Sequence, residues 1–177
     1  MNETTDKKTE QLMVLIETMI GIIKYDNQYA YQLLQSVTLN KSAVIDIDEC
    51  KVFLKAFGGD DYVLTLNKAD SEAVVQFSTH SYTLQRIIAG NTTIDKAIAE
   101  NEIFVMAGFH DLLNIYKLTT CLLAEGPLNP VLRNLWQEFK ETWCSPLECR
   151  IMPVEHQKPR YDFLISSIPE NALLVKI

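Results

Sequence analysis

The sequence predicts an α+β protein, because its apolar residues follow two different periods in separate parts of the chain. They recur at helical spacing across residues 9–37 and at a period of two across residues 43–79. Helical spacing returns from about residue 111 onward. A block of strands set between helical segments is typical of an α+β fold.

Length and composition predict one water-soluble domain. The chain has 177 residues, of which 47% are hydrophobic and 22% are charged, and these values are ordinary for a globular protein with a real core. We therefore expect a single domain over residues 1–144, with an N-terminal helical segment over residues 1–37. A C-terminal extension over residues 145–177 is expected to pack on that domain.

The N-terminal segment is predicted to be one long helix or two. Leu12, Ile16, Met19 and Ile23 follow one helical face, and Asp26 with Asn27 marks a break, because both residue types favour caps and turns. The apolar stripe is wide enough to pack on a sheet or on a second copy of itself.

The next part of the chain predicts an antiparallel meander. Its strands are expected at residues 44–47, 51–57, 62–66 and 73–77. Gly58 and Gly59 supply the positive φ that the tight turn at residues 58–61 requires.

Two short helices and a further strand follow. A helix over residues 82–89 ends at Gly90 in a left-handed C-cap, and Thr92 or Thr93 caps the next helix. A strand is expected at residues 103–106.

Two longer helices complete the predicted domain. One covers about residues 111–125 and ends at Gly126, and the other begins after an Asn129 cap with proline in its first turn. Its apolar positions continue to Phe139.

The chain shows no established catalytic or metal motif, so we expect no enzyme, no cofactor and no metal site. Asp111 is interpreted as a helix cap beside His110, and the acidic residues 46, 48 and 49 as a solvated strand face. The four cysteines are expected to be reduced thiols. A small hydrolase or transferase using His110 or Cys121 is the minor alternative.

Charge and apolar run length exclude several partners. The net charge of −7 opposes binding to nucleic acid and to anionic lipid surfaces. The longest apolar run, residues 12–23, is too short for a transmembrane helix, and the polar start of the chain resembles no secretory signal. We therefore expect a cytoplasmic protein.

The remaining signal is a surplus of apolar side chains on consecutive elements after residue 86. This surplus fits an ordinary core, and it also fits a hydrophobic cavity, because ligand pockets are lined mainly by such side chains. The candidate ligand-binding residues are Ile87, Ile88, Phe104, Met106, Leu112, Ile115 and Leu118.

Residues 84–116 contain a pattern of apolar positions, glycines and an alanine, formed by Leu84, Ile87, Gly90, Ala97, Ile103 to Met106, Gly108, Leu112 and Tyr116. This pattern resembles that of the sterol carrier protein type 2 domain family, a sterol-binding family. The likeness extends over roughly residues 40–125. It departs from the family pattern at Asn101, where a glycine is usual, and in an interval from Ala97 to Gly108 that is one residue longer.

The resemblance implies a largely antiparallel sheet of about five strands with helices packed on one face. It also implies an internal tunnel and non-enzymatic binding or transfer of a lipid-like molecule, such as a fatty acid, a sterol or an isoprenoid. The alternative is an interaction or accessory module with a self-filled core, which forms a homodimer through the N-terminal helix.

Overall fold

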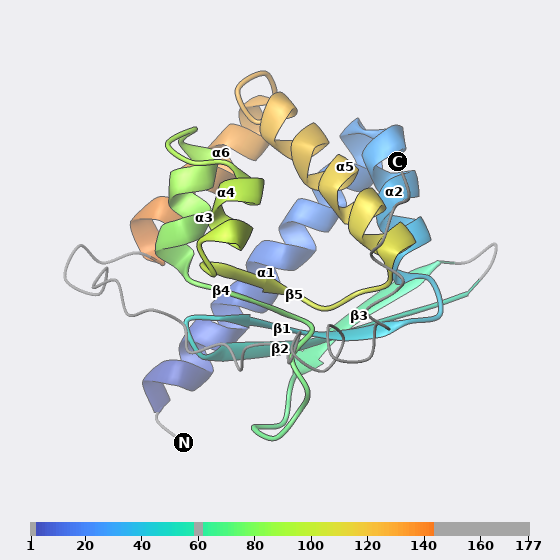
Figure 1. The fold of residues 1–177 in the computed structure, drawn as a ribbon, viewed down its shortest axis with the longest axis vertical. Helices are drawn as coiled ribbons and strands as arrows, with labels where there is room; N and C mark the ends of the chain where they lie inside the picture. The colour runs from blue at the N-terminus through green and yellow to red at the C-terminus, as the bar shows by residue number, and fades with distance from the viewer. Residues whose placement is uncertain (1–2, 59–61, 144–177) are drawn as a thin grey trace, which may run out of the picture.

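The computed structural model describes residues 3–58 and 62–143. In this part of the chain six helices and a five-stranded sheet form an α+β fold (Figure 1), as the sequence predicts. Most of the predicted turn at residues 58–61 and the whole of the predicted C-terminal extension over residues 145–177 lie outside the described residues.

The N-terminal segment forms two helices, α1 (Glu3–Asp26) and α2 (Gln28–Thr38). The predicted break between them is confirmed, because the Asn27 side chain accepts a hydrogen bond of 2.8 Å from the Ala30 amide and caps α2. The apolar stripe of α1 packs inside the chain, where Leu12 is only 1% exposed.

The sheet has the strand order β3-β2-β1-β4-β5. Its strands are β1 (Ser42–Ile47), β2 (Cys50–Phe57), β3 (Val63–Lys68), β4 (Phe77–Thr79) and β5 (Ile103–Val105). The first three form the predicted antiparallel meander, but β4 runs parallel to β1, so the sheet is mixed. The strand expected at residues 73–77 begins only at Phe77, because the residues before it belong to the connection from β3.

The other helices are α3 (Ser81–Ile88), α4 (Ile94–Ala99), α5 (Phe109–Glu125) and α6 (Pro130–Thr142). Their predicted ends are largely confirmed. Gly90 has a φ of +74° after α3, the Thr93 hydroxyl accepts from the Lys96 amide, and Asn129 caps α6.

The helices cover one face of the sheet (Figure 1). Alternate residues of β2 are buried on this face, as the two-residue period of a strand requires. In Figure 1, α3 and α4 stand on one side of α1, and α2 and α5 stand on the other. Between these two groups, α1 packs directly on β2 and β3.

Most of the buried apolar residues fall into three groups. The sheet cluster joins α1, β1, β2, β3 and α6, and consists of Leu12, Ile16, Ile47, Cys50, Val52, Leu54, Leu66, Phe139 and Trp143. The α2–α5 cluster consists of Ile23, Ala30 and Leu122, and the α3–β5 cluster consists of Ile87, Ala97 and Ile103. Single domains more often bury one contiguous core.

Candidate ligand-binding site

A row of half-buried apolar side chains crosses three strands on the helix-covered face. Ile45 of β1 is paired with Phe77 of β4, and Phe77 is paired with Val105 of β5. Ile45 is also paired with Val52, which is fully buried in the sheet cluster, so the row faces the helices. All three side chains keep partial solvent access although they lie on the covered face of the sheet.

Other half-buried apolar side chains surround each of the three clusters. Met13, Leu15, Ile20, Ile45, Leu64, Leu84 and Ile88 pack against the sheet cluster; Met19, Tyr31, Leu118 and Cys121 pack against the α2–α5 cluster; and Phe77, Ile94, Val105 and Leu123 pack against the α3–β5 cluster.

These half-buried side chains occur where the clusters adjoin. Ile45 and Phe77 are cross-strand partners, yet they pack against different clusters. Leu118 and Leu123 lie on the same helix and also pack against different clusters. Half-buried apolar side chains therefore lie where neighbouring clusters meet.

The structure distributes the seven sequence-predicted residues over several surroundings. Ile87 is buried in the α3–β5 cluster, Ile88 packs against the sheet cluster, and Leu118 packs against the α2–α5 cluster. Ile115 is half-buried on α5. These four residues lie around the interior and do not form one continuous patch.

The other three predicted residues lie elsewhere. Phe104 is paired with Ser78, and strand alternation places its side chain on the sheet face opposite to that of Val105. Met106 and Leu112 are 47% and 37% exposed. Because residues 103–106 are all apolar, the sequence does not reveal which of them face the helices.

The outer face of the sheet carries a groove of about 380 Å³. It is lined by Ser42, Ala43, Val44, Phe53, Lys68, Ala69, Asp70, Ala73, Val74 and Gln76. None of the seven predicted residues lines it. The Gln76 side chain accepts a hydrogen bond of 2.6 Å from the Val44 amide and fixes the connection before β4 against β1. The lining is mixed in polarity and differs from the apolar row on the opposite face.

A polar cluster at the turn between β1 and β2 was not predicted. Asp48 has a φ of +51°, and its carboxylate accepts hydrogen bonds from the Ser81 amide at 3.1 Å and from Trp143 Nε1 at 2.9 Å. It also accepts from the Ser81 hydroxyl and lies 3.2 Å from His80 Nδ1. The expectation of a solvated strand face is thus wrong for Asp48, because the fold brings residues distant in sequence to it.

The hydrogen bonds of this cluster favour the ionised form of Asp48 over the protonated form. Burial alone would raise the pKa of Asp48, but the hydrogen bonds from Ser81, Trp143 and His80 outweigh burial and hold the pKa below 3.8. The Ser81 hydroxyl donates its hydrogen bond to this carboxylate. A nucleophilic serine would instead donate to its general base, such as a histidine. Asp48 therefore caps α3 through the Ser81 amide and holds the end of α6 in place through Trp143.

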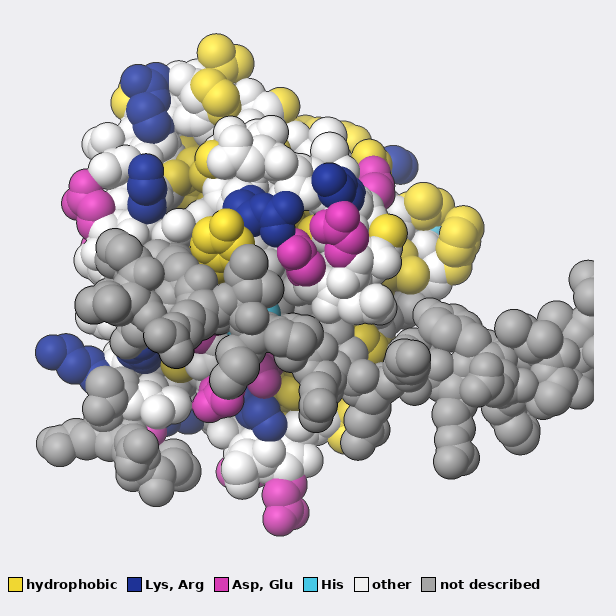
Figure 2. Space-filling model, turned by 60° about the vertical axis from the view of Figure 1, so that its left-hand side comes forward, with side chains coloured by type: hydrophobic (Ala, Val, Ile, Leu, Met, Phe, Trp, Pro, Cys, Tyr) yellow, Lys and Arg dark blue, Asp and Glu magenta, His cyan; other side chains and the backbone are white. Residues whose placement is uncertain are grey.

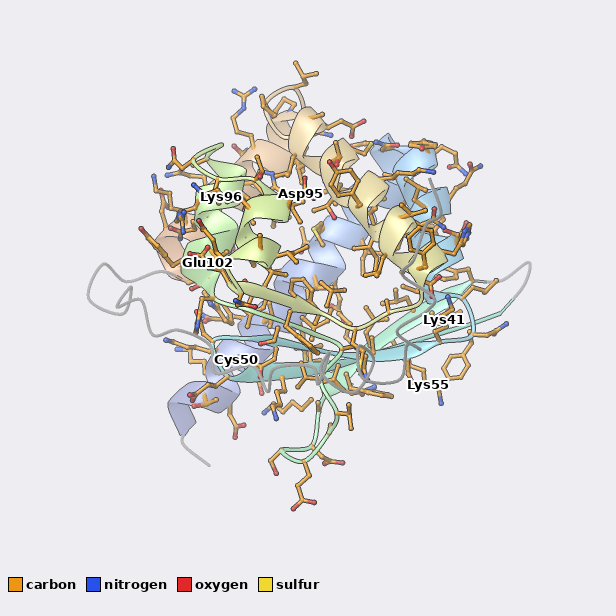
Figure 3. All side chains as sticks on the ribbon, in the orientation of Figure 1. Lys41, Cys50, Lys55, Asp95, Lys96 and Glu102 are labelled. Carbon is orange, nitrogen blue, oxygen red and sulfur yellow. The ribbon has the colours of Figure 1, made fainter. Side chains whose placement is uncertain are left out.

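Asp111 also differs from its predicted role. Gly108 occupies the N-cap position of α5, and the Asp111 carboxylate binds Lys41 Nζ at 2.7 Å instead. Figure 3 shows Lys41 near the N-terminal end of α5. The pair connects α5 to the chain between α2 and β1, so Asp111 links two elements and does not cap its own helix by a side-chain hydrogen bond.

Within residues 3–58 and 62–143, no helix is long and apolar enough to cross a membrane, and no three ligating side chains are grouped to hold a metal ion. Compared with known proteins, the chain matches no family model, no curated protein and no solved structure.

Proposed function

We propose that the protein binds a lipid-like apolar molecule between the helices and the covered face of the sheet. The observation that carries this proposal is the row of Ile45, Phe77 and Val105, which lies on the helix-covered face and is still half-buried. A close-packed interior would leave almost no accessible surface at such positions. A ligand occupying this region would contact the edges of all three clusters.

The chemistry of the lining fits a long apolar ligand. Burial of apolar surface contributes about 25 cal/mol per Å², so covering ~300 Å² of a fatty acid, sterol or isoprenoid would contribute roughly 7 kcal/mol before the costs of binding. Half-buried hydrophobic side chains pack against all three clusters and could contact such a ligand. Affinity for such a ligand needs no reacting group, and binding or transfer without chemical change is the activity that we propose.

The resemblance to the sterol carrier protein type 2 domain family supports the same proposal. A tunnel between the layers of the fold is what that resemblance implies, and the half-buried row lies between the sheet and the helices. Membership of this family is part of the proposal.

Native mass spectrometry of the full chain, followed by titration with fluorescent fatty acid, sterol and isoprenoid probes, tests the proposal. We expect stoichiometric binding of at least one probe class. Leu118→Trp should weaken that binding at least tenfold, because Leu118 is half-buried against the α2–α5 cluster and the larger side chain would occupy the proposed ligand region. Leu128→Trp is the matched control, because Leu128 is 79% exposed and lies outside the three clusters. A folded protein that binds none of the probes would contradict the proposal.

A further inference from the structure

Helix α5 presents an exposed apolar stripe along its N-terminal half. Phe109 is 79% exposed, Leu112 37%, Leu113 44% and Tyr116 46%. Their spacing of i, i+3, i+4 and i+7 places them on one side of the helix. Figure 2 shows hydrophobic side chains gathered at the right-hand edge of the described surface. Contiguous exposed apolar patches of this kind mark interaction sites.

The opposite side of α5 already has a partner in the fold. Buried Asn114 donates a hydrogen bond of 3.3 Å to the Ser36 hydroxyl of α2, and Leu122 belongs to the α2–α5 cluster. Packing against α2 therefore accounts for one side of the helix. It does not account for the stripe, which faces away from α2.

The stripe is symmetric about its own midpoint. Its residues are aromatic, leucine, leucine and aromatic, at positions 109, 112, 113 and 116. In an antiparallel pair of α5 helices related by a two-fold axis, Phe109 faces Tyr116 of the other copy, and Leu112 faces Leu113. An isologous interface requires such a self-complementary pattern.

We propose that this stripe is the centre of a homodimer interface in which two α5 helices pack antiparallel. An aromatic residue that is fully exposed buries on the order of 150–250 Å², and Phe109 and Tyr116 still expose 79% and 46% of their surfaces. With Met106 and neighbouring polar groups at the rim, the stripe supplies the apolar centre that a standard interface of about 800 Å² per partner needs.

The charges of α5 are compatible with this pairing although the chain carries a net charge of −7. The helix has only two acidic residues, Asp111 and Glu125. Asp111 is bound to Lys41, and Glu125 lies at the far end of the helix, where it accepts a hydrogen bond from Asn27. Two copies can thus approach along the stripe with little repulsion between like charges.

This interface replaces the one expected from the sequence. Leu12, Ile16 and Ile23 of α1 are 1%, 7% and 2% exposed. The apolar stripe of α1 is therefore already buried within one chain. The α5 stripe is exposed, whereas Leu118 of the same helix is half-buried against the α2–α5 cluster. Dimerisation and ligand binding can therefore succeed or fail independently.

Sedimentation equilibrium of the full chain tests the proposed dimer. We expect the unaltered protein to dimerise and Phe109→Glu or Leu113→Glu to raise the dimer dissociation constant at least tenfold. Leu128→Glu is the control, because Leu128 and Phe109 are equally exposed at 79%. Circular dichroism verifies that each variant is folded.

A charge-reversal experiment tests the antiparallel register. Position 113 lies near the two-fold axis, so Leu113→Glu and Leu113→Lys should each be monomeric alone and should form a mixed dimer together. An unaltered protein that stays monomeric up to its solubility limit contradicts the proposal. A dimer that persists in both glutamate variants contradicts it equally, since the contact would then lie elsewhere.

Discussion

Asp48 shows at the scale of one residue how a position that looks like part of a polar strand becomes a structural centre. Its carboxylate joins the turn between β1 and β2 to the start of α3 and to Trp143 at the end of α6. The left-handed backbone of a turn is one that aspartate and asparagine tolerate better than most residues. The residue therefore combines a turn, a helix cap and a contact with the sheet cluster.

Asp48→Asn should lower the free energy of unfolding by about 1–3 kcal/mol, because the neutral amide loses charge-assisted hydrogen bonds and places a donor where Asp48 only accepts. Asp46→Asn is the matched control, because Asp46 lies two residues before Asp48 and carries the same side chain. Burial raises the pKa of Asp46, so its charge is unfavourable in the fold and the neutral variant should be as stable as the unaltered protein or more stable. Urea unfolding at pH 7 measures both variants, and equal losses would contradict this account.

The same two carboxylates predict a pH dependence with opposite signs. The pKa of Asp48 lies below its ordinary value of 3.8, so its contribution to stability is present above about pH 4 and is lost as the pH falls further. The pKa of Asp46 is raised, so the folded state binds a proton first and its contribution rises as the pH falls. Denaturant unfolding measured from pH 6 downward should show that the free energy of unfolding falls less steeply with decreasing pH in Asp48→Asn than in the unaltered protein. A steeper loss would show that the sign is wrong.

At the scale of secondary structure, replacing glycine by alanine should have opposite effects on stability at two positions, Gly90 and Gly21. Gly90 follows the C-cap of α3 and has a φ of +74°, and Gly21 lies inside α1. A methyl group would meet no atom within 4 Å at either position, so only backbone conformation differs between them.

Gly90→Ala should therefore destabilise the fold by about 1–2 kcal/mol, because an L side chain is strained in the left-handed region. Gly21→Ala should stabilise it by roughly 0.5–1 kcal/mol, because alanine has the higher helix propensity. Thermal and urea unfolding of the two variants give the comparison. A shift of the same sign in both would mean that backbone conformation does not dominate at these sites.

Local chemistry made most element boundaries predictable. Asn27, Gly90 and Asn129 act as caps or stops through contacts within a few residues, so the sequence contains the whole cause. The parallel pairing of β4 with β1 was not predictable, because β4 has only three residues and its partner lies 32 positions away.

The candidate site was predictable only in part, for a related reason. Ile87, Ile88, Ile115 and Leu118 belong to helices whose inner faces the periodicity reveals. Phe104 lies in a short strand where every residue is apolar, so its direction depends on the pairing with Ser78. Ile45 and Phe77 were missed because their importance comes from the register between strands.

For the whole molecule, the central question is whether the space between the three clusters is filled or open. Leu118→Phe addresses it, because Leu118 is half-buried against the α2–α5 cluster. We expect a change below about 1 kcal/mol in the free energy of unfolding, together with weaker ligand binding, since an open interior accepts the larger side chain. Leu122→Phe, at a buried position on the same helix, should cost about 1–3 kcal/mol through overpacking. Equal destabilisation by both substitutions would indicate a filled interior.

Proposed ligand binding is tested most directly by isoleucine methyl NMR of the full chain during titration with a long-chain fatty acid, a sterol and an isoprenoid. The methyl resonances of Ile45, Ile88 and Ile94 should shift together and saturate, because these half-buried side chains of three different elements pack against the sheet cluster or the α3–β5 cluster. Ile98 of α4, which is 45% exposed, reports nonspecific contact and should not shift. Absence of shifts at the three inner residues with every ligand, or shifts confined to Ile98, would contradict the proposed binding of an apolar ligand inside the fold.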